Sequence, residues 1–261
     1  MGIMQGKRGL IVGVANDHSY AYHIAESLNK QGAQCLFTHL PGEKMERRVR
    51  KAIGQLDIDE PWLASMDAGS DDDINAVFKR VADDFETIDF VVHSIAFADK
   101  DYLKIGSFTG TPRQVFTQAC DISAYTYAAM ANAVVQNELM PKGGAMVSMS
   151  YYGAEKAVPG YNVMGVAKAA LEATTRYLAM ELGPQDIRVN SISGGPLRTM
   201  SALAVGRFSE ISDWVAKKSP LGRNVTGSEV GDTAAWLLSD MSSGVTGQII
   251  YVDCGYSIMG L

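Results

Sequence analysis

The sequence contains few cysteines and no long apolar run. Its cysteines, Cys35, Cys120 and Cys254, lie far apart without C-x-x-C spacing, which indicates neither a disulfide framework nor a zinc site. No stretch approaches the roughly 18 consecutive apolar residues of a transmembrane helix, and the short apolar run at residues 9–15 is not typical of a signal peptide. We therefore expect a cytoplasmic protein with no membrane partner and no metal.

Positive charge is also scarce, with a formal net charge of −6 and a pI near 5.2. Nucleic-acid binding needs clustered Lys and Arg, and the one basic cluster, residues 44–51, is interrupted by acidic residues. The composition therefore argues against a nucleic-acid partner. Apolar residues make up 47% of the 261 residues, an ordinary globular balance that favours one domain over residues 1–261.

Seven short apolar runs alternate with amphipathic stretches and predict a doubly wound α/β fold. Continuous apolar runs are typical of parallel strands that helices cover on both faces. We expect a single Rossmann-type domain with a seven-stranded parallel sheet. The predicted strands are residues 9–14, 34–38, 62–66, 90–95, 145–150, 189–193 and 248–252, and the predicted helices are residues 21–31, 43–54, 71–86, 112–139, 161–182 and 228–239.

One segment, at about residues 194–220, does not fit this alternation. It carries Gly, Pro, Ser and a short apolar stretch and is longer than a typical connection in an α/β unit. Excursions after the carboxyl ends of parallel strands line the ligand crevice. We interpret this segment as a substrate-binding loop, with a surface insertion as the alternative.

The loop after the first strand has features of a dinucleotide site without the G-x-G-x-x-G fingerprint. Gly13 ends the strand and Ser19 stands at the next helix start, where free amides favour phosphate. Asp67 and Ser94-Ile95 close two further strands at the same predicted edge. An ordinary strand-to-helix turn and a capping aspartate are the alternatives.

The second strand ends in Thr38-His39-Leu40-Pro41, which contains neither a ribose-selecting acid nor an adjacent Arg or Lys. The nearest arginines, Arg47 and Arg48, lie a turn or more into the following helix. This arrangement favours NADH over NADPH.

Tyr161 and Lys168 are seven residues apart, which on a helix returns almost to the same face roughly 10.5 Å along the axis. A phenol beside an ammonium can donate a proton to an oxygen that becomes negative. Tyr151 is a second phenol at the end of the fifth strand. Tyr152 and Lys156 form a competing Y-x-x-x-K pair, but Pro159 follows closely and argues against a sustained helix there.

These residues resemble the bacterial enoyl-acyl-carrier-protein reductases, a divergent branch of the short-chain dehydrogenase/reductase family. The resemblance covers essentially the whole chain, and its Y-x6-K spacing separates this branch from its Y-x-x-x-K relatives. The motifs are Gly6-Lys7-Arg8, Gly13-Val14-Ala15, His93-Ser94-Ile95-Ala96-Phe97-Ala98, Ser150-Tyr151-Tyr152-Gly153-Ala154-Glu155-Lys156, Tyr161-Asn162-Val163-Met164-Gly165-Val166-Ala167-Lys168-Ala169, Arg188-Val189-Asn190 and Gly195-Pro196-Leu197-Arg198-Thr199.

The resemblance implies reduction of a trans-2-enoyl thioester on acyl carrier protein by NADH, with NADPH possible. It implies that Tyr161 holds the thioester carbonyl, that Lys168 binds the nicotinamide ribose, that Tyr151 is the second active-site tyrosine, and that Ala98 forms the substrate wall. It also implies a homotetramer. The implied nucleotide contacts are Gly13, Ser19, Tyr20, Asp67, Ala68, Ser94, Ile95, Leu197 and Thr199.

Two positions depart from the family pattern: Ala96 stands where glycine is common, and Leu40 replaces a polar residue. Acyl-chain accommodation needs an apolar wall, for which the candidates are Phe97, Ala98, Met200, Ala202, Leu203, Ala204 and Phe208. Ordinary core packing is the alternative for each of them. Two other functions remain. One is a carbonyl or 3-oxoacyl reductase, but Gly165 stands four residues after Tyr161, where such an enzyme has its lysine. The other is a catalytically silent NADH-binding protein.

Overall fold

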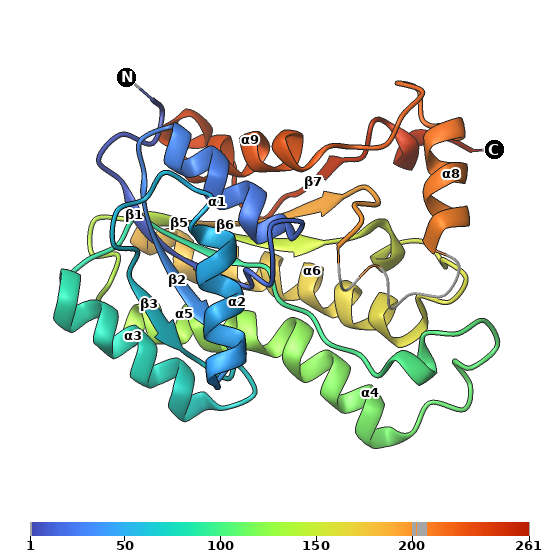
Figure 1. Cartoon of the computed structure of the whole chain (residues 1–261), viewed down its shortest axis with the longest axis horizontal. Helices are drawn as coiled ribbons and strands as arrows, with labels where there is room; N and C mark the ends of the chain where they lie inside the picture. The colour runs from blue at the N-terminus through green and yellow to red at the C-terminus, as the bar shows by residue number, and fades with distance from the viewer. Residues whose placement is uncertain (1, 200–201, 203–207, 261) are drawn as a thin grey trace.

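A computed structural model describes residues 2–199, 202 and 208–260, and its centre is a seven-stranded sheet (Figure 1). The strand order is β3-β2-β1-β4-β5-β6-β7, and every neighbouring pair is parallel. The predicted doubly wound fold is therefore confirmed. The strands are β1 (Arg8–Val12), β2 (Gln34–His39), β3 (Leu63–Ser65), β4 (Phe90–His93), β5 (Gly144–Ser150), β6 (Ile187–Gly194) and β7 (Ile249–Val252).

Helices cover both faces of the sheet, as the continuous apolar strands require. One apolar core lies under α1 (Tyr20–Lys30), α2 (Glu43–Ile53) and α9 (Gly227–Leu238). The other core lies under α3 (Asp71–Phe85), α5 (Thr126–Gln136) and α6 (Asn162–Leu182). Figure 1 shows α9 and α6 on opposite sides of the sheet.

The predicted helix at residues 112–139 is wrong in detail. It consists of α4 (Arg113–Cys120), a π-helical segment (Asp121–Tyr125) and α5. The extra residue of a π segment changes the direction of the side chains that follow, and two hydroxyls in this region bond to the end of β4 and the segment after it. The Ser123 hydroxyl donates to the Phe97 carbonyl and accepts from its N–H, and Thr126 pairs with His93.

Several predicted element ends also move. The strands predicted at residues 9–14 and 90–95 end earlier, at Val12 and His93. The residues that follow, beginning with Gly13 and Ser94, leave the sheet and form loops at the ligand edge. The helix predicted to start at residue 112 begins one residue later, since α4 starts at Arg113. The predicted helix end at residue 182 is confirmed, since α6 ends at Leu182.

The described part of the loop at residues 194–220 contains one further helix, α8 (Phe208–Lys218). The predicted wall residues Met200, Leu203 and Ala204 lie outside the described residues. Ala202 is described, and its N–H donates to the Thr199 hydroxyl at 3.1 Å. Among the residues that the structure describes, no helix has the length and apolarity to cross a membrane.

Candidate active site

The carboxyl ends of β1 and β4 approach each other closely at Gly13. Its φ is +113°, and a Cβ there would lie 2.1 Å from the Ser94 carbonyl oxygen. Any side chain would therefore force the loop after β1 away from the loop after β4. Gly13, Ser94 and Ile95 are thus brought together at the sheet edge where the sequence predicted a dinucleotide.

The start of α1 provides the nearby positive helix end. Ser19 caps the helix by accepting from the Tyr22 N–H, and the first turn contains no acidic residue. The first turn of α3, by contrast, contains Asp71, Asp72 and Asp73. Since free amides and the helix dipole favour anions where no carboxylate competes, the α1 terminus fits the diphosphate of a dinucleotide.

Tyr20 connects this loop to the end of β6, because its hydroxyl donates to the Gly195 carbonyl. Leu197 and Thr199 follow on the same segment and are partly buried. At the other end of the site, Asp67 is exposed just after β3, and its carboxylate accepts from the Gly69 N–H at 2.9 Å. Ala68 is half-buried beside Asp67, so the predicted nucleotide contacts follow one edge of the sheet.

Lys168 is a buried cation at the end of β5. Only 6% of the residue is exposed, and its Nζ donates to the Met149 carbonyl at 2.6 Å. Burial lowers the pKa of Lys168 to about 8, while the carboxylate of Glu172 acts in the opposite direction. An ammonium with such a pKa stays charged at neutral pH and can hold hydroxyl groups beside β5.

Tyr161 and Tyr151 pack edge to face, with ring centroids 4.9 Å apart and planes at 68°. Burial raises the pKa of Tyr161 well above its usual value, and the Tyr151 and Tyr20 phenols add to this. Burial also raises the pKa of Tyr151 to about 12. Both phenols therefore remain protonated at neutral pH and can act as hydrogen-bond donors.

The predicted helical path from Tyr161 to Lys168 is wrong in one respect. Tyr161 precedes α6 as its capping residue, and Asn162 has a left-handed φ of +48°. The two side chains nevertheless reach one short segment, since Lys168 bonds to Met149 and Tyr161 packs against Tyr151. The structure thus brings the predicted pair together at the end of β5.

The competing pair Tyr152 and Lys156 does not form such a site. Only a 3₁₀ turn (Tyr152–Ala154) forms there, as Pro159-Gly160 predicted. The Lys156 side chain is 55% exposed and pairs with Glu155 at 3.1 Å. This lysine therefore points to solvent.

Gly165 shows why α6 carries no lysine four residues after Tyr161. A Cβ at Gly165 would lie 2.7 Å from the Gly153 carbonyl oxygen, so the backbone after β5 fills the space that a side chain would need. This packing opposes the arrangement of the Y-x-x-x-K reductases.

A small apolar cluster lies beside Tyr161. Its buried members come from α4, α6 and the segment after β4, and Ala96, Ala98 and Tyr161 pack against it. Phe97 is 46% exposed. Ala98, which the sequence placed in the substrate wall, thus shares a cluster with Tyr161.

Sequence reasoning missed three residues around these groups. Glu172 is buried one turn after Lys168 and accepts a hydrogen bond from the Ser150 hydroxyl at 2.5 Å. Its spacing of four residues from Lys168 could have predicted that the two side chains lie close together. Asn162 and Ser123 gave no such signal, because a left-handed residue and a π segment depend on tertiary contacts.

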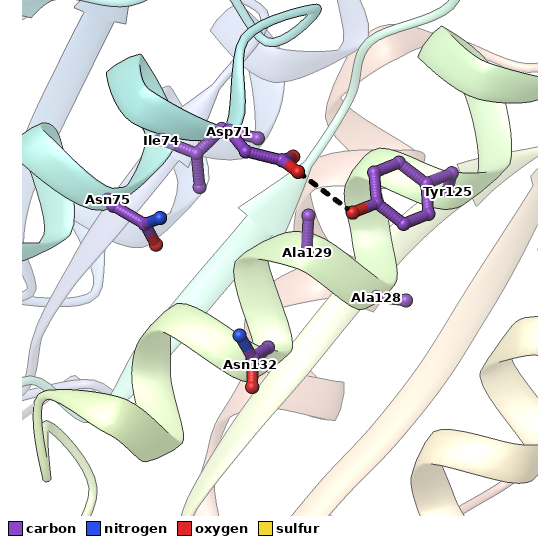
Figure 2. A pocket seen from close by; sticks show the side chains of 7 residues that line it. All are labelled: Asp71, Ile74, Asn75, Tyr125, Ala128, Ala129 and Asn132. Carbon is purple, nitrogen blue, oxygen red and sulfur yellow. Dashed lines mark hydrogen bonds between the residues drawn. The ribbon is translucent and has the colours of Figure 1, made fainter.

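A separate groove lies between α3, the π-helical segment and α5 (Figure 2). The Tyr125 hydroxyl donates to the Asp71 carboxylate across it at 3.1 Å. None of the predicted site residues lines it; its lining residues are Asp71, Ile74, Asn75, Tyr125, Ala128, Ala129 and Asn132.

Comparisons with known proteins agree with this geometry. The model of the family described as Enoyl-(Acyl carrier protein) reductase matches residues 13–257. The chain is 45% identical over 261 residues to the enoyl-[acyl-carrier-protein] reductase [NADH] FabI of Synechocystis, covering 99% of each protein. It is 46% identical over 253 residues to the enoyl-[acyl-carrier-protein] reductase [NADPH] FabI of Staphylococcus aureus, covering 97% of each.

A solved structure shows the same fold. The Bacillus cereus enoyl-acyl carrier protein reductase, crystallised with NADP+ and indole naphthyridinone, matches with a TM-score of 0.96 and 45% identity over 100% of both chains. With a family model and full-length relatives in agreement, the chain belongs to the enoyl-acyl-carrier-protein reductase family.

Proposed function

We propose that this chain reduces the carbon–carbon double bond of a trans-2-enoyl thioester on acyl carrier protein, with Tyr161, Lys168 and Tyr151 at the reacting end. The observation that carries the proposal is that Lys168 bonds to Met149 at the end of β5 while Tyr161 packs on Tyr151 directly after that strand. When bound, NADH supplies the hydride, which adds to the β-carbon and drives negative charge onto the thioester oxygen.

In this mechanism Tyr161 donates a hydrogen bond to the thioester oxygen. Its raised pKa keeps the proton on the phenol at neutral pH, so the donor is in place before charge develops on the oxygen. Tyr151 packs on the Tyr161 ring and restricts its orientation. The apolar cluster around Ala98 excludes water from the acyl side.

Lys168 holds the nicotinamide ribose through its ammonium. The Met149 carbonyl fixes the direction of that ammonium at 2.6 Å. The ends of the strands and the start of α1 support further contacts to the dinucleotide. The residues we expect to make them are Gly13, Ser19, Tyr20, Asp67, Ala68, Ser94, Ile95, Leu197 and Thr199.

The adenosine end supports NADH as the preferred cofactor. Leu40 is 55% exposed where the chain leaves β2, and the ring of His39 bonds to the Leu40 carbonyl. The Arg47 guanidinium bonds to the Glu43 carbonyl within α2. A 2′-phosphate gains no cation at the strand end itself, although a relative named for NADPH shows that the family accommodates both.

The experiment for this function compares substrates and cofactors on the purified protein. We expect oxidation of NADH by crotonyl-CoA or an enoyl-acyl carrier protein, and slower oxidation of NADPH. Activity restricted to 3-oxoacyl thioesters would indicate a carbonyl reductase, and cofactor binding without turnover would indicate a silent NADH-binding protein.

We also infer a homotetramer. The outer face of α6 carries apolar side chains that the single chain leaves uncovered: Tyr177 and Met180 are each 70% exposed, and Val166 is 36% exposed. A helix that is apolar on more than one face is typical of a subunit interface. Light scattering tests this inference, and a monomer would contradict it.

Two further expectations belong to this proposal. We infer that residues 1–261 form one domain, because one sheet unites strands from β1 to β7; a single cooperative unfolding transition is the expected result. We also propose a cytoplasmic location, which fits the reduced state of Cys35, Cys120 and Cys254. Fractionation of the source cells tests it.

A further inference from the structure

Asn162, the first residue of helix α6, has a left-handed backbone directly after Tyr161. Its φ is +48°, a conformation that costs an L-residue free energy unless its surroundings maintain it. Asparagine tolerates this region better than most side chains. The conformation sets the direction in which Tyr161 leaves the helix start.

The side chain of Asn162 holds this conformation through the loop that follows the predicted substrate wall. Its Nδ2 donates to the carbonyls of Tyr102 and Lys104, each at 2.7 Å, and lies 3.1 Å from the Ser107 hydroxyl. The two short bonds use both protons of the amide. The Ser107 hydroxyl in turn donates to the Lys104 carbonyl at 2.7 Å, so the amide lies at the centre of the turn.

This loop and Tyr161 belong to the same apolar cluster. Leu103, which lies between the two carbonyls that Asn162 binds, is 4% exposed and packs in the cluster that Tyr161 and Ala98 contact. Moving Asn162 would therefore displace the phenol and the acyl wall together. The nucleotide edge, at Gly13 and Ser19, is not part of this cluster.

We propose that Asn162 is a positioning residue for enoyl reduction, which fixes Tyr161 and the loop at residues 102–107 relative to each other through its left-handed backbone and its bonds to Tyr102 and Lys104. The inference rests on the proposed function. Asn162 acts on the thioester end of the site and leaves the cofactor end unchanged.

Two substitutions separate the backbone from the amide. Asn162→Gly keeps the positive φ and removes the bonds, whereas Asn162→Ala removes the bonds and also disfavours the φ. Glu138 supplies a matched control: it has a φ of +49° and an exposed side chain after α5. Glu138→Gly and Glu138→Ala calibrate the effect of φ alone.

We expect Asn162→Gly to lower kcat/KM for crotonyl-CoA about 10-fold and Asn162→Ala to lower it about 100-fold, because small displacements of reacting groups have large effects on rate. The dissociation constant of NADH should stay within about twofold of the wild-type value, because Asn162 acts on the thioester end of the site and not on the cofactor end. Hydrogen–deuterium exchange of residues 102–107 should rise in both Asn162 variants. The Glu138 variants should match the wild type in both measurements.

Wild-type kcat/KM in both Asn162 variants would overturn the proposal, and so would faster exchange without a change in kcat/KM, which would leave a purely structural role. A loss of kcat/KM matched by an equal loss of NADH affinity would also overturn it. If the Ala variant does not fold, the Gly variant decides alone. Failure of the proposed function is a different result, in which the wild-type protein reduces no enoyl thioester.

Discussion

Two tyrosine–lysine pairs lie close together in this sequence, and the fold treats them in opposite ways. Lys168 is 6% exposed, bonds to the end of β5 and has its pKa lowered to about 8 by burial. The Lys156 side chain is 55% exposed, and its bond to Glu155 raises its pKa. Tyr161 packs on Tyr151, whereas Tyr152 packs on Tyr256 near the C-terminus.

The difference shows that the placement of a pair at a strand end determines its chemistry. Spacing alone would favour Tyr152 and Lys156, because Y-x-x-x-K is the commoner arrangement in the short-chain family. The backbone after β5 instead forms only a 3₁₀ turn, and α6 then returns Lys168 to the Met149 carbonyl. Substitutions at the two pairs should therefore have unequal effects.

Lys168→Ala should have the largest effect. It removes the cation that holds the ribose and leaves the Met149 carbonyl without its buried donor. We expect kcat/KM to fall about 10³-fold and the dissociation constant of NADH to rise at least ~10-fold. Steady-state kinetics and fluorescence titration with NADH measure the two effects, and circular dichroism checks folding. Unchanged NADH affinity would contradict the role of Lys168.

Tyr161→Phe should lower kcat about 10²-fold, because the thioester oxygen loses its donor while the ring still packs on Tyr151. NADH affinity should remain within about twofold of the wild type. The comparison with Lys168→Ala is the control, since the two variants should affect different parameters. Equal losses of NADH affinity in both would show that the roles are not divided in this way.

Glu172→Gln should shift the pH dependence of NADH binding. Lys168 loses its proton as the pH rises through about 8, so affinity should fall above that pH. Glu172 opposes this loss. The other ionisable groups coupled to Lys168 or Glu172 are His93, Glu155, Tyr161, Arg176 and Tyr251. Removing the carboxylate should move the midpoint below 8 and weaken binding at pH 8 by up to ~10-fold.

The measurement is the NADH dissociation constant from pH 6.5 to 9.5. Thr175→Val is the control, because Thr175 bonds to Ser191 on the same face of α6 without bearing charge. A profile that superimposes on the wild type would contradict the role of Glu172. Lys168 by itself should make the free energy of unfolding rise between pH 8 and 10.5, since the unfolded state then binds its proton. The buried phenols of Tyr161 and Tyr151 act in the opposite direction near pH 10, because the folded state keeps their protons.

Lys156→Ala should have the smallest effect. Exposed ion pairs contribute little because water and salt screen them, and Lys156 pairs with Glu155 at the surface. We expect kcat/KM for crotonyl-CoA within about twofold of the wild type, measured beside Lys168→Ala. A large loss here would reverse the comparison between the two pairs.

The sequence predicted the sheet, its helices and most residues of the site edge, because burial on both faces and strand ends leave clear patterns. Gly13, Ser19, Lys168 and Tyr151 lie where the spacing placed them. Periodicity could not locate the π-helical segment at Asp121–Tyr125, because its side chains bond to residues distant in sequence: Ser123 to Phe97 and Tyr125 to Asp71.

The same reason applies to Asn162. The sequence predicted a regular helix from Tyr161, but three contacts with residues 102–107 hold a left-handed residue at its start. Loop pairings of this kind join segments about 60 residues apart, beyond the reach of local pattern. Glu172 was predictable from its one-turn spacing to Lys168, since a carboxylate on a buried face needs a partner.

The most direct test of the central claim is the absorbance of NADH when the wild-type protein, Lys168→Ala and Lys156→Ala each meet an enoyl-acyl carrier protein. We predict a fall in absorbance with the wild type and Lys156→Ala, and almost none with Lys168→Ala. Full activity in Lys168→Ala together with loss in Lys156→Ala would contradict the account.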